Sequence, residues 1–248
     1  MSVNVVPVAD LDALVARAAS DVIDVVTRAQ AGAGLYDDGI ARIVLTGGGA
    51  GIGLLGRLRE LDWAAQQQPD FPALRIDWSR VHIFFGDERA VPVAHADSNE
   101  GQARAALLDH VAVTDDFVHS YRLGELSLTE SAQWYEQEVE TWAPRGFDLH
   151  LLGMGGEGHI NSLFPHTSAV NENEALVVPV SDSPKPPAER VSLTMPAIRQ
   201  ADSVWLLVAG AEKAEAARHV IEGADYRDWP AAGAIGRRDT RMYLAEQS

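Results

Sequence analysis

Short apolar runs rich in Val, Ile, Leu and Phe alternate along the chain with longer stretches in which apolar residues recur at helical spacing. The short runs predict strands at 5–8, 42–46, 81–86, 117–121, 147–153, 175–180, 203–210 and 241–245. The longer stretches predict helices at 10–30, 51–67, 98–110, 128–142 and 211–222. This alternation is typical of repeated βα units. We therefore predict an α/β fold with a mostly parallel open sheet and helices on both faces.

The segments between these elements are too short to divide the chain. Loops are expected around Pro69 and Pro72 and in the proline-rich stretch SDSPKPPAER at 181–190. That stretch is too stiff for a random linker and too short to separate domains. There is no internal repeat, and 248 residues with 46% hydrophobic content suffice for one packed core. The sequence predicts a single domain over residues 1–248.

The composition narrows the class of partner. A formal net charge of -16 argues against nucleic acid or an anionic membrane surface, since both reward clustered Lys and Arg. The absence of cysteine excludes disulfides, thiolate nucleophiles and Cys-based metal sites. We read no signal peptide and no apolar run long enough to span a membrane, so we expect a cytoplasmic protein. We expect a monomer and leave weak self-association open.

Polar residues and glycines follow several predicted strands, where open parallel sheets bind their ligands. After the second strand comes a turn that includes Gly47 and Gly48, whose amides and following helix N-terminus can receive a phosphate or carboxylate. A tight turn without a ligand is the alternative. After the third strand come Asp87 and Arg89. Charges at the mouth of an apolar strand either bind a ligand or cap a helix.

The strand predicted at 147–153 runs into the segment GMGGEGHI, which carries Gly155, Glu157 and His159. Glycine at this density implies that backbone must come close to a ligand, and we expect a negatively charged one. An imidazole with a pKa of about 6.5 can take a proton from water at neutral pH, so His159 is a candidate base. A capping histidine is the alternative. Glu157 either orients His159 or serves only the turn.

The other histidines have simpler interpretations. His82 and His150 lie inside predicted strands and are interpreted as packing residues. His119 is expected on an ordinary helix or loop surface.

Further cations complete the candidate pocket. Lys213 lies one turn into a predicted helix, where the helix dipole prefers an acid, so either a bound anion or simple solvation accounts for it. Arg190 and Lys185 add positive charge. Signatures of serine hydrolases, zincins and P-loop enzymes are absent, and we expect no metal or cofactor. A base, amides and cations fit attack by activated water on a carbonyl in a phosphorylated small molecule.

The chain resembles the glucosamine-6-phosphate isomerase/6-phosphogluconolactonase family over nearly its whole length. The resemblance rests on RIVLTGGGAG, FFGDERAVPVAHADSNEGQAR, FDLHLLGMGGEGHINSLFPHT, SPKPPAERVSLT and GAEKAEA, of which the second and third are long and specific. It implies a Rossmann-like fold related to that of the glucosamine-6-phosphate deaminases. Arg89 and the segment Ser162-Leu163-Phe164-Pro165 match the lactonase pattern rather than the deaminase pattern.

This resemblance implies hydrolysis of 6-phosphoglucono-δ-lactone to 6-phosphogluconate, the second step of the oxidative pentose phosphate pathway. The partner would be a phosphorylated sugar lactone, with no metal or cofactor. His159 would be the general base, and Asp87 would orient the histidine or a sugar hydroxyl. Contacts to substrate or phosphate would come from Gly47, Gly48, Arg89, Gly155, Arg190 and Lys213.

Two rival interpretations stay open. A deaminase or isomerase acting on another sugar phosphate would pair an acid with His159 for ring opening, and the residue at the corresponding place is Phe164. A sugar-phosphate sensor would need a DNA-binding module, yet only one amphipathic helix precedes the second strand, with no basic recognition helix. Such a sensor would also not need His159.

Overall fold

The computed structural model describes residues 3–67 and 75–245, so the loop expected around Pro69 and Pro72 lies outside the described residues. The elements in chain order are β1 (Asn4–Val8), α1 (Leu11–Arg28), β2 (Ala41–Leu45), α2 (Gly48–Gln67), β3 (Val81–Phe85), β4 (Asp87–Arg89), α3 (Asn99–Ala106), α4 (Leu128–Trp142), β5 (Leu149–Gly153), β6 (Val177–Val180), β7 (Arg190–Leu193), α5 (Met195–Arg199), β8 (Ser203–Val208), α6 (Ala214–Glu222) and β9 (Asp239–Ala245). Every predicted helix is present, with boundaries shifted by a few residues.

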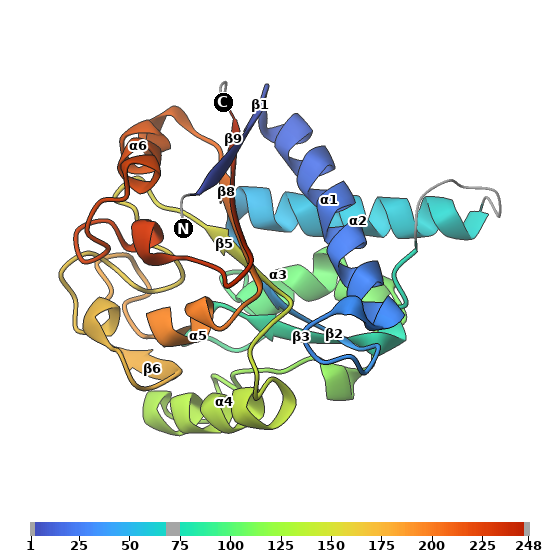
Figure 1. Cartoon of the computed structure of the whole chain (residues 1–248). Coiled ribbons are helices and arrows are strands. Elements are labelled where there is room, and N and C mark those ends of the chain that lie inside the picture. Colours follow the sequence, from blue (N-terminus) through green and yellow to red (C-terminus); the bar gives the residue numbers. More distant parts are fainter. Residues whose placement is uncertain (1–2, 68–74, 246–248) are drawn as a thin grey trace.

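The main sheet has six strands in the order β1-β9-β8-β5-β2-β3, and every neighbouring pair in it is parallel. Helices α1 and α2 cover one face, and α5 and α6 lie on the other (Figure 1). Strands β2, β3 and β8 are buried along their whole length, as expected for parallel strands covered on both faces. The predicted α/β fold, with a mostly parallel sheet and helices on both faces, is confirmed.

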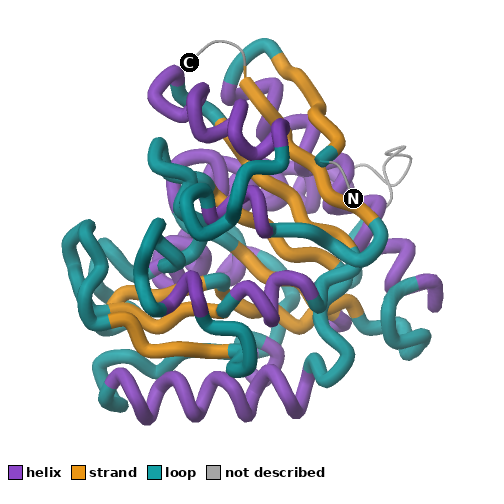
Figure 2. Tube along the Cα trace, turned by 60° about the vertical axis from the view of Figure 1, so that its left-hand side comes forward, coloured by secondary structure: helices purple, strands orange, loops and turns teal. Residues whose placement is uncertain are grey.

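A second, smaller sheet was not predicted. Its three antiparallel strands have the order β4-β7-β6, and they pack against α4, as Figure 2 shows near the bottom of the view. The strand predicted at 175–180 belongs to this sheet as β6. The chain passes from β3 through Gly86 directly into β4, so a single residue connects these two strands of different sheets.

The strand predicted at 117–121 is wrong. Asp115–Phe117 form a short 3₁₀ helix, and in this segment only Val118 makes a bridge, to Ile83 of β3. Val118 and Tyr121 are buried at this edge of the main sheet. The apolar pattern therefore reflects burial of an irregular segment, which periodicity alone cannot distinguish from a strand.

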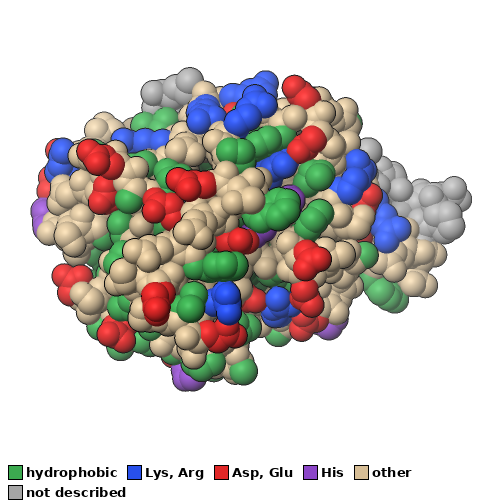
Figure 3. Space-filling model, turned by 90° about the horizontal axis from the view of Figure 1, so that it is seen from below, with side chains coloured by type: hydrophobic (Ala, Val, Ile, Leu, Met, Phe, Trp, Pro, Cys, Tyr) green, Lys and Arg blue, Asp and Glu red, His purple; other side chains and the backbone are tan. Residues whose placement is uncertain are grey.

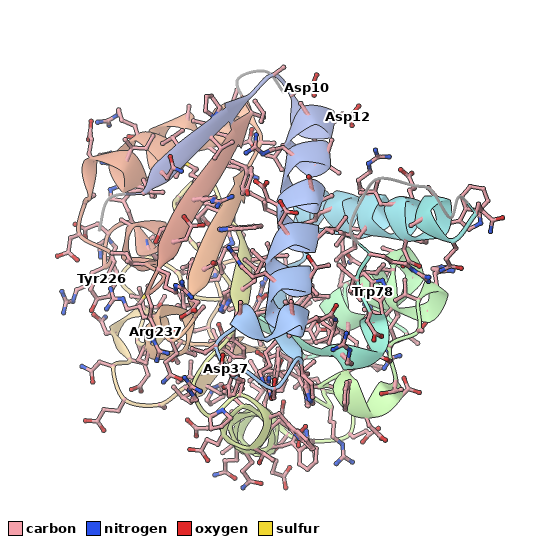
Figure 4. All side chains as sticks on the ribbon, turned by 45° about the vertical axis from the view of Figure 1, so that its right-hand side comes forward. Asp10, Asp12, Asp37, Trp78, Tyr226 and Arg237 are labelled. Atoms are coloured by element: carbon pink, nitrogen blue, oxygen red, sulfur yellow. The ribbon has the colours of Figure 1, made fainter. Side chains whose placement is uncertain are left out.

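Local sequence fixes the starts of two helices. Asp10 caps α1 by accepting a hydrogen bond from the Ala13 amide at 2.8 Å, and Figure 4 shows Asp10 and Asp12 at the start of that helix. Ser98 caps α3 in the same way, from the Gly101 amide at 3.0 Å. These side chains satisfy amide groups that have no partner within the first turn.

The surface carries mixed charge over an apolar interior. The buried apolar side chains of the described residues, apart from Phe164, form one cluster. On the face seen in Figure 3, acidic and basic side chains are interspersed with apolar ones. Among the helices of residues 3–67 and 75–245, none has the length and apolar content needed to cross a membrane.

Candidate active site

The candidate site lies at the carboxyl edge of the main sheet, where four neighbouring strands end. Strands β8, β5, β2 and β3 are contiguous and parallel, so their carboxyl ends meet at one edge. The segments singled out in the sequence follow these strands. Gly47 follows β2, Asp87 follows β3, His159 follows β5 and Lys213 follows β8. The fold thus brings together four parts of the chain that lie far apart in sequence.

A cavity of about 370 Å³ occupies this edge. All of the site residues predicted from the sequence line it, namely Gly47, Gly48, Asp87, Arg89, Gly155, His159, Arg190 and Lys213. Its lining combines exposed backbone at the glycines with both acidic and basic side chains. In the part of the chain that the structure describes, no group of three or more His, Cys, Asp or Glu side chains is placed to hold a metal ion.

The glycine-rich segment after β5 forms a turn that seats His159. The Gly155 amide donates to the His159 carbonyl at 3.0 Å, and the Gly158 amide donates to the Gly155 carbonyl at 3.0 Å. Gly158 has φ +77, which glycine adopts without strain. A Cβ at Gly155 would collide with the His159 ring. Gly155 therefore makes room for the base, and its amide is already used inside the turn.

Glu157 orients the His159 ring. Glu157 Oε1 lies 3.2 Å from His159 Nδ1 and 2.8 Å from Lys185 Nζ. Because Glu157 accepts from both, we assign the Nδ1 proton to His159, which leaves Nε2 as the basic nitrogen. Phe164 stacks on the ring with centroids 4.4 Å apart, which fixes the ring plane. Of the two roles left open for Glu157, orientation of His159 fits this geometry.

Burial of the His159 ring favours its neutral form. Burial and the nearby Lys185 cation lower the pKa of His159, and the Glu157 carboxylate only partly opposes them. Burial alone would raise the pKa of Glu157, but the hydrogen bond from Lys185, together with His159, brings it down to about 2. A neutral imidazole beside an ionised carboxylate is the form in which a histidine can accept a proton.

Asp87 is held by groups other than His159. Its carboxylate accepts hydrogen bonds from Ser162 Oγ at 2.7 Å and Asn99 Nδ2 at 3.1 Å, and Arg190 Nη1 lies 3.8 Å away. Within the described residues, Asp87 makes no hydrogen bond to His159. Of the two roles that the resemblance implied for Asp87, contact with a sugar hydroxyl fits this geometry better than orientation of the histidine.

The predicted cations differ in how many hydrogen bonds and ion pairs their side chains already make within the protein. Arg89 donates to the Asp97 carbonyl at 2.8 Å and to Asn99 Oδ1 at 2.9 Å. Arg190 is 5% exposed and donates to two carbonyls of the proline-rich loop, each at 3.0 Å. Lys213 makes no ion pair with the described residues. Lys213 is therefore the cation most available to an incoming anion.

The glycine turn after β2 lines the same cavity as the cations of the proline-rich loop. Helix α2 begins at Gly48, which has φ +78, so the first amides of a 20-residue helix face this edge. Thr46 Oγ1 accepts the Gly153 amide at 3.0 Å and ties the ends of β2 and β5 together. Unpaired amides at a helix N-terminus form a receptor for an anion, as the sequence predicted for this turn.

Sequence reasoning singled out neither Asn161, which lines the cavity, nor the supporting role of Glu88, which lies outside the lining. Glu88 is buried and accepts the Asn99 and Glu100 amides at 2.9 Å each, so it anchors α3 against β4. Asn161 lines the cavity two residues after His159. A buried acid within the triplet Asp-Glu-Arg could have been suspected from the apolar strand before it. Nothing in the sequence marked Asn161.

This arrangement defines an α/β protein with a cavity lined by cations, glycine backbone and a histidine at the carboxyl edge of a parallel sheet. A family model described as glucosamine-6-phosphate isomerases/6-phosphogluconolactonase matches residues 9–243. The chain belongs to this family, as its sequence resemblance predicted.

Individual relatives agree with this assignment. The chain is 46% identical over 252 residues to the 6-phosphogluconolactonase of Mycobacterium tuberculosis, covering 98% of this chain and 95% of that protein. It is 40% identical to the Streptomyces coelicolor 6-phosphogluconolactonase, covering 95% and 89%. Its fold is similar to that of 6-phosphogluconolactonase from Trypanosoma cruzi, with a TM-score of 0.81 and 24% identity over 99% of this chain and 96% of that one. A monomeric glucosamine-6-phosphate deaminase has the same fold, with a TM-score of 0.80 and 20% identity over 98% and 97%.

Proposed function

We propose that this protein hydrolyses 6-phospho-D-glucono-1,5-lactone to 6-phospho-D-gluconate in the pentose phosphate pathway. The observation that carries the proposal is the His159 imidazole, whose Nδ1 lies 3.2 Å from Glu157, at the wall of a cavity lined with cations. Similarity to curated 6-phosphogluconolactonases over nearly the whole chain supports the choice of substrate.

The geometry suits a single base acting on water. His159 Nε2 takes a proton from water, and the hydroxide adds to the lactone carbonyl carbon while the carbonyl electron pair moves to its oxygen. The tetrahedral intermediate then collapses, and the bond from that carbon to the ring oxygen breaks. The protonated His159 returns its proton to the ring oxygen, which becomes the C5 hydroxyl. A general base of this kind contributes about 10²- to 10⁴-fold to the rate.

The phosphate of the substrate accounts for the remaining features of the cavity. Lys213 and the amides at the start of α2 would bind the phosphate, with Arg89 and Arg190 adding positive charge around it. Asp87 would accept from a sugar hydroxyl. Anchoring the phosphate at one end places the lactone carbonyl at the other end, beside His159.

The lactonase proposal is tested by generating the lactone in situ from glucose 6-phosphate and following its disappearance above the spontaneous background. The same preparation is assayed for ammonia release from glucosamine 6-phosphate. We expect acceleration in the first assay and none in the second. The proposal fails if lactone disappears no faster than the background, and ammonia release would favour the deaminase alternative.

The two charged neighbours of His159 should shift its activity profile in opposite directions. His159 is active when neutral, so kcat/KM falls on the acid side as the imidazole is protonated. Lys185→Met removes a charge that lowers the pKa of His159, so the acid limb should move to higher pH. Glu157→Gln removes a charge that raises this pKa, so the limb should move to lower pH. Steady-state rates between about pH 5 and 8, a range around the ordinary histidine pKa, measure both shifts.

Lys213→Met serves as the control for lost positive charge in the cavity. It should raise KM without moving the acid limb, because Lys213 is not among the groups that shift the pKa of His159. Shifts of the same sign in Lys185→Met and Glu157→Gln would contradict the assigned roles.

A further inference from the structure

Asn161 has a polar side chain for which the folded protein provides no partner. The residue is 9% exposed and lines the cavity, and neither Oδ1 nor Nδ2 makes a hydrogen bond within the described residues. A buried carboxamide left unpaired destabilises a protein, typically by about 1–3 kcal/mol. The backbone is also in the left-handed region, with φ +49. Asn161 therefore has two features that lower the stability of the fold, an unpaired carboxamide and a left-handed backbone, two residues after His159.

Asn99 shows what a purely structural amide looks like in the same cavity. Its Nδ2 donates to the Asp87 carbonyl at 2.8 Å and to the Asp87 carboxylate at 3.1 Å, and its Oδ1 accepts from Arg89 at 2.9 Å. The side chain of Asn99 packs against Gly47, and the side chain of Asn161 packs against Gly86. A Cβ at either glycine would collide with the carboxamide that packs on it. Both amide side chains pack against a glycine, but within the described residues only that of Asn99 has hydrogen-bond partners.

The backbone beneath Asn161 is rigid. The Gly86 amide donates to the Leu45 carbonyl at 3.1 Å, and the Gly86 carbonyl accepts from the Leu193 amide at 2.8 Å. Gly86 is thus fixed to the main sheet on one side and to the small sheet on the other. Both polar atoms of the Asn161 side chain are buried in the unliganded protein, so the carboxamide must turn toward the cavity to meet a ligand.

We propose that Asn161 binds the reacting end of the substrate and that its Nδ2 donates a hydrogen bond to the lactone carbonyl oxygen and to the oxyanion formed from it. The cations and the glycine turn are suited to the phosphate, whereas the carbonyl needs a donor on the same side of the cavity as His159. Asn161 follows His159 by two residues and is an uncommitted donor there. This assignment rests on the proposed lactonase function.

Kinetics of Asn161→Ala and Asn161→Gly test the proposal. An oxyanion donor acts mainly in the transition state, so kcat should fall by about 10²-fold while KM changes little. The glycine variant accepts positive φ and guards against misfolding. Asn161→Asp, which removes the donor and adds a negative charge, should be at least as impaired. A rise in KM with kcat unchanged would overturn the oxyanion role, and wild-type kinetics in both variants would overturn the contact.

Thermal unfolding separates this role from a structural one. Asn161→Gly should unfold at or above the wild-type midpoint, because an unpartnered amide stabilises nothing and glycine relieves the strained φ. Asn99→Ala should unfold at a lower temperature, since it loses the three hydrogen bonds of Asn99. A clear loss of stability in Asn161→Gly would indicate a structural residue and contradict the proposal.

Binding of 6-phosphogluconate, measured by calorimetry, distinguishes failure of this inference from failure of the lactonase proposal. The product carries a carboxylate where the lactone carries its carbonyl, so Asn161→Ala should weaken its binding by several-fold. If the wild type does not hydrolyse lactone but the variant still loses affinity, the contact stands and the lactonase proposal fails. Equal affinities in the two proteins would contradict the contact, whatever the activity.

Discussion

His159→Ala is expected to lower kcat for lactone hydrolysis by about 10²- to 10⁴-fold, the usual contribution of a general base. The imidazole lies at the cavity wall with Glu157 Oε1 3.2 Å from its Nδ1, and burial lowers the pKa of His159, which favours a free Nε2. Binding of 6-phosphogluconate should persist, because the phosphate contacts remain. Progress curves of lactone disappearance, corrected for the spontaneous reaction, measure the effect.

A histidine of the same segment provides the matched control. His166 has a side chain that is 74% exposed and a positive φ of 61, which asparagine tolerates, so His166→Asn should keep wild-type activity. If His159→Ala hydrolyses the lactone as fast as the wild type and His166→Asn, then His159 is only structural. Loss of product binding in His159→Ala would instead point to disruption of the whole cavity.

The free energy of unfolding is expected to fall by several kcal/mol as the pH drops from about 6.5 to about 4. The reason is that burial favours the neutral form of three histidines in the folded state. Burial lowers the pKa of His82 and His119 to about 4, with mutual repulsion adding to the effect at His82, and lowers that of His150 to about 3. In the unfolded chain these groups bind protons near the ordinary pKa of about 6.5. Between the two values the unfolded state holds more protons, so acid favours unfolding.

Urea unfolding at a series of pH values measures this loss. Buried Glu88 and Asp148 and partly exposed Glu138 have a raised pKa and oppose the trend, so single variants are needed to separate the contributions. His150→Leu removes an imidazole whose two nitrogens have no partner in the described residues and should flatten the dependence between pH 4 and 6.5. His95→Gln, at a half-exposed side chain, should leave the slope unchanged. An unchanged slope in His150→Leu would contradict the prediction.

Much of the main sheet could be predicted because most of its strands are short, largely apolar and separated by helical stretches. The small sheet could not, because β4 has three residues and begins with the charged pair Asp87 and Glu88. Strand pairing over so short a stretch depends on β7, which lies about a hundred residues further along the chain. His119 was expected on a surface but is buried, where its ring lies 2.8 Å from His82 and 2.7 Å from Glu138.

Many residues that line the candidate site could be predicted from the sequence, but their contacts with one another could not. Strand ends followed by glycine, acid or cation indicate which side chains meet, because parallel strands end together. The sequence does not indicate which of those side chains are already bonded to one another. Arg190 and Asn161 illustrate the difference. Arg190 was predicted, yet its side chain already donates hydrogen bonds to two backbone carbonyls. Asn161 was not predicted, and its side chain has no hydrogen-bond partner in the described residues.

The pairing of β1 with β9 has a consequence for how the protein is made. In the main sheet β1 contacts no strand except β9, where Asn4 pairs with Arg241 and Val8 with Ala245. Strand β1 therefore has no strand to pair with in the main sheet until β9 has been synthesised. Helix α1 also packs on β9. Until then the edge of β8 stays open to other chains, and closure over so long a loop is slow. Nascent chains that stop short of β9 should be the species most in need of a chaperone.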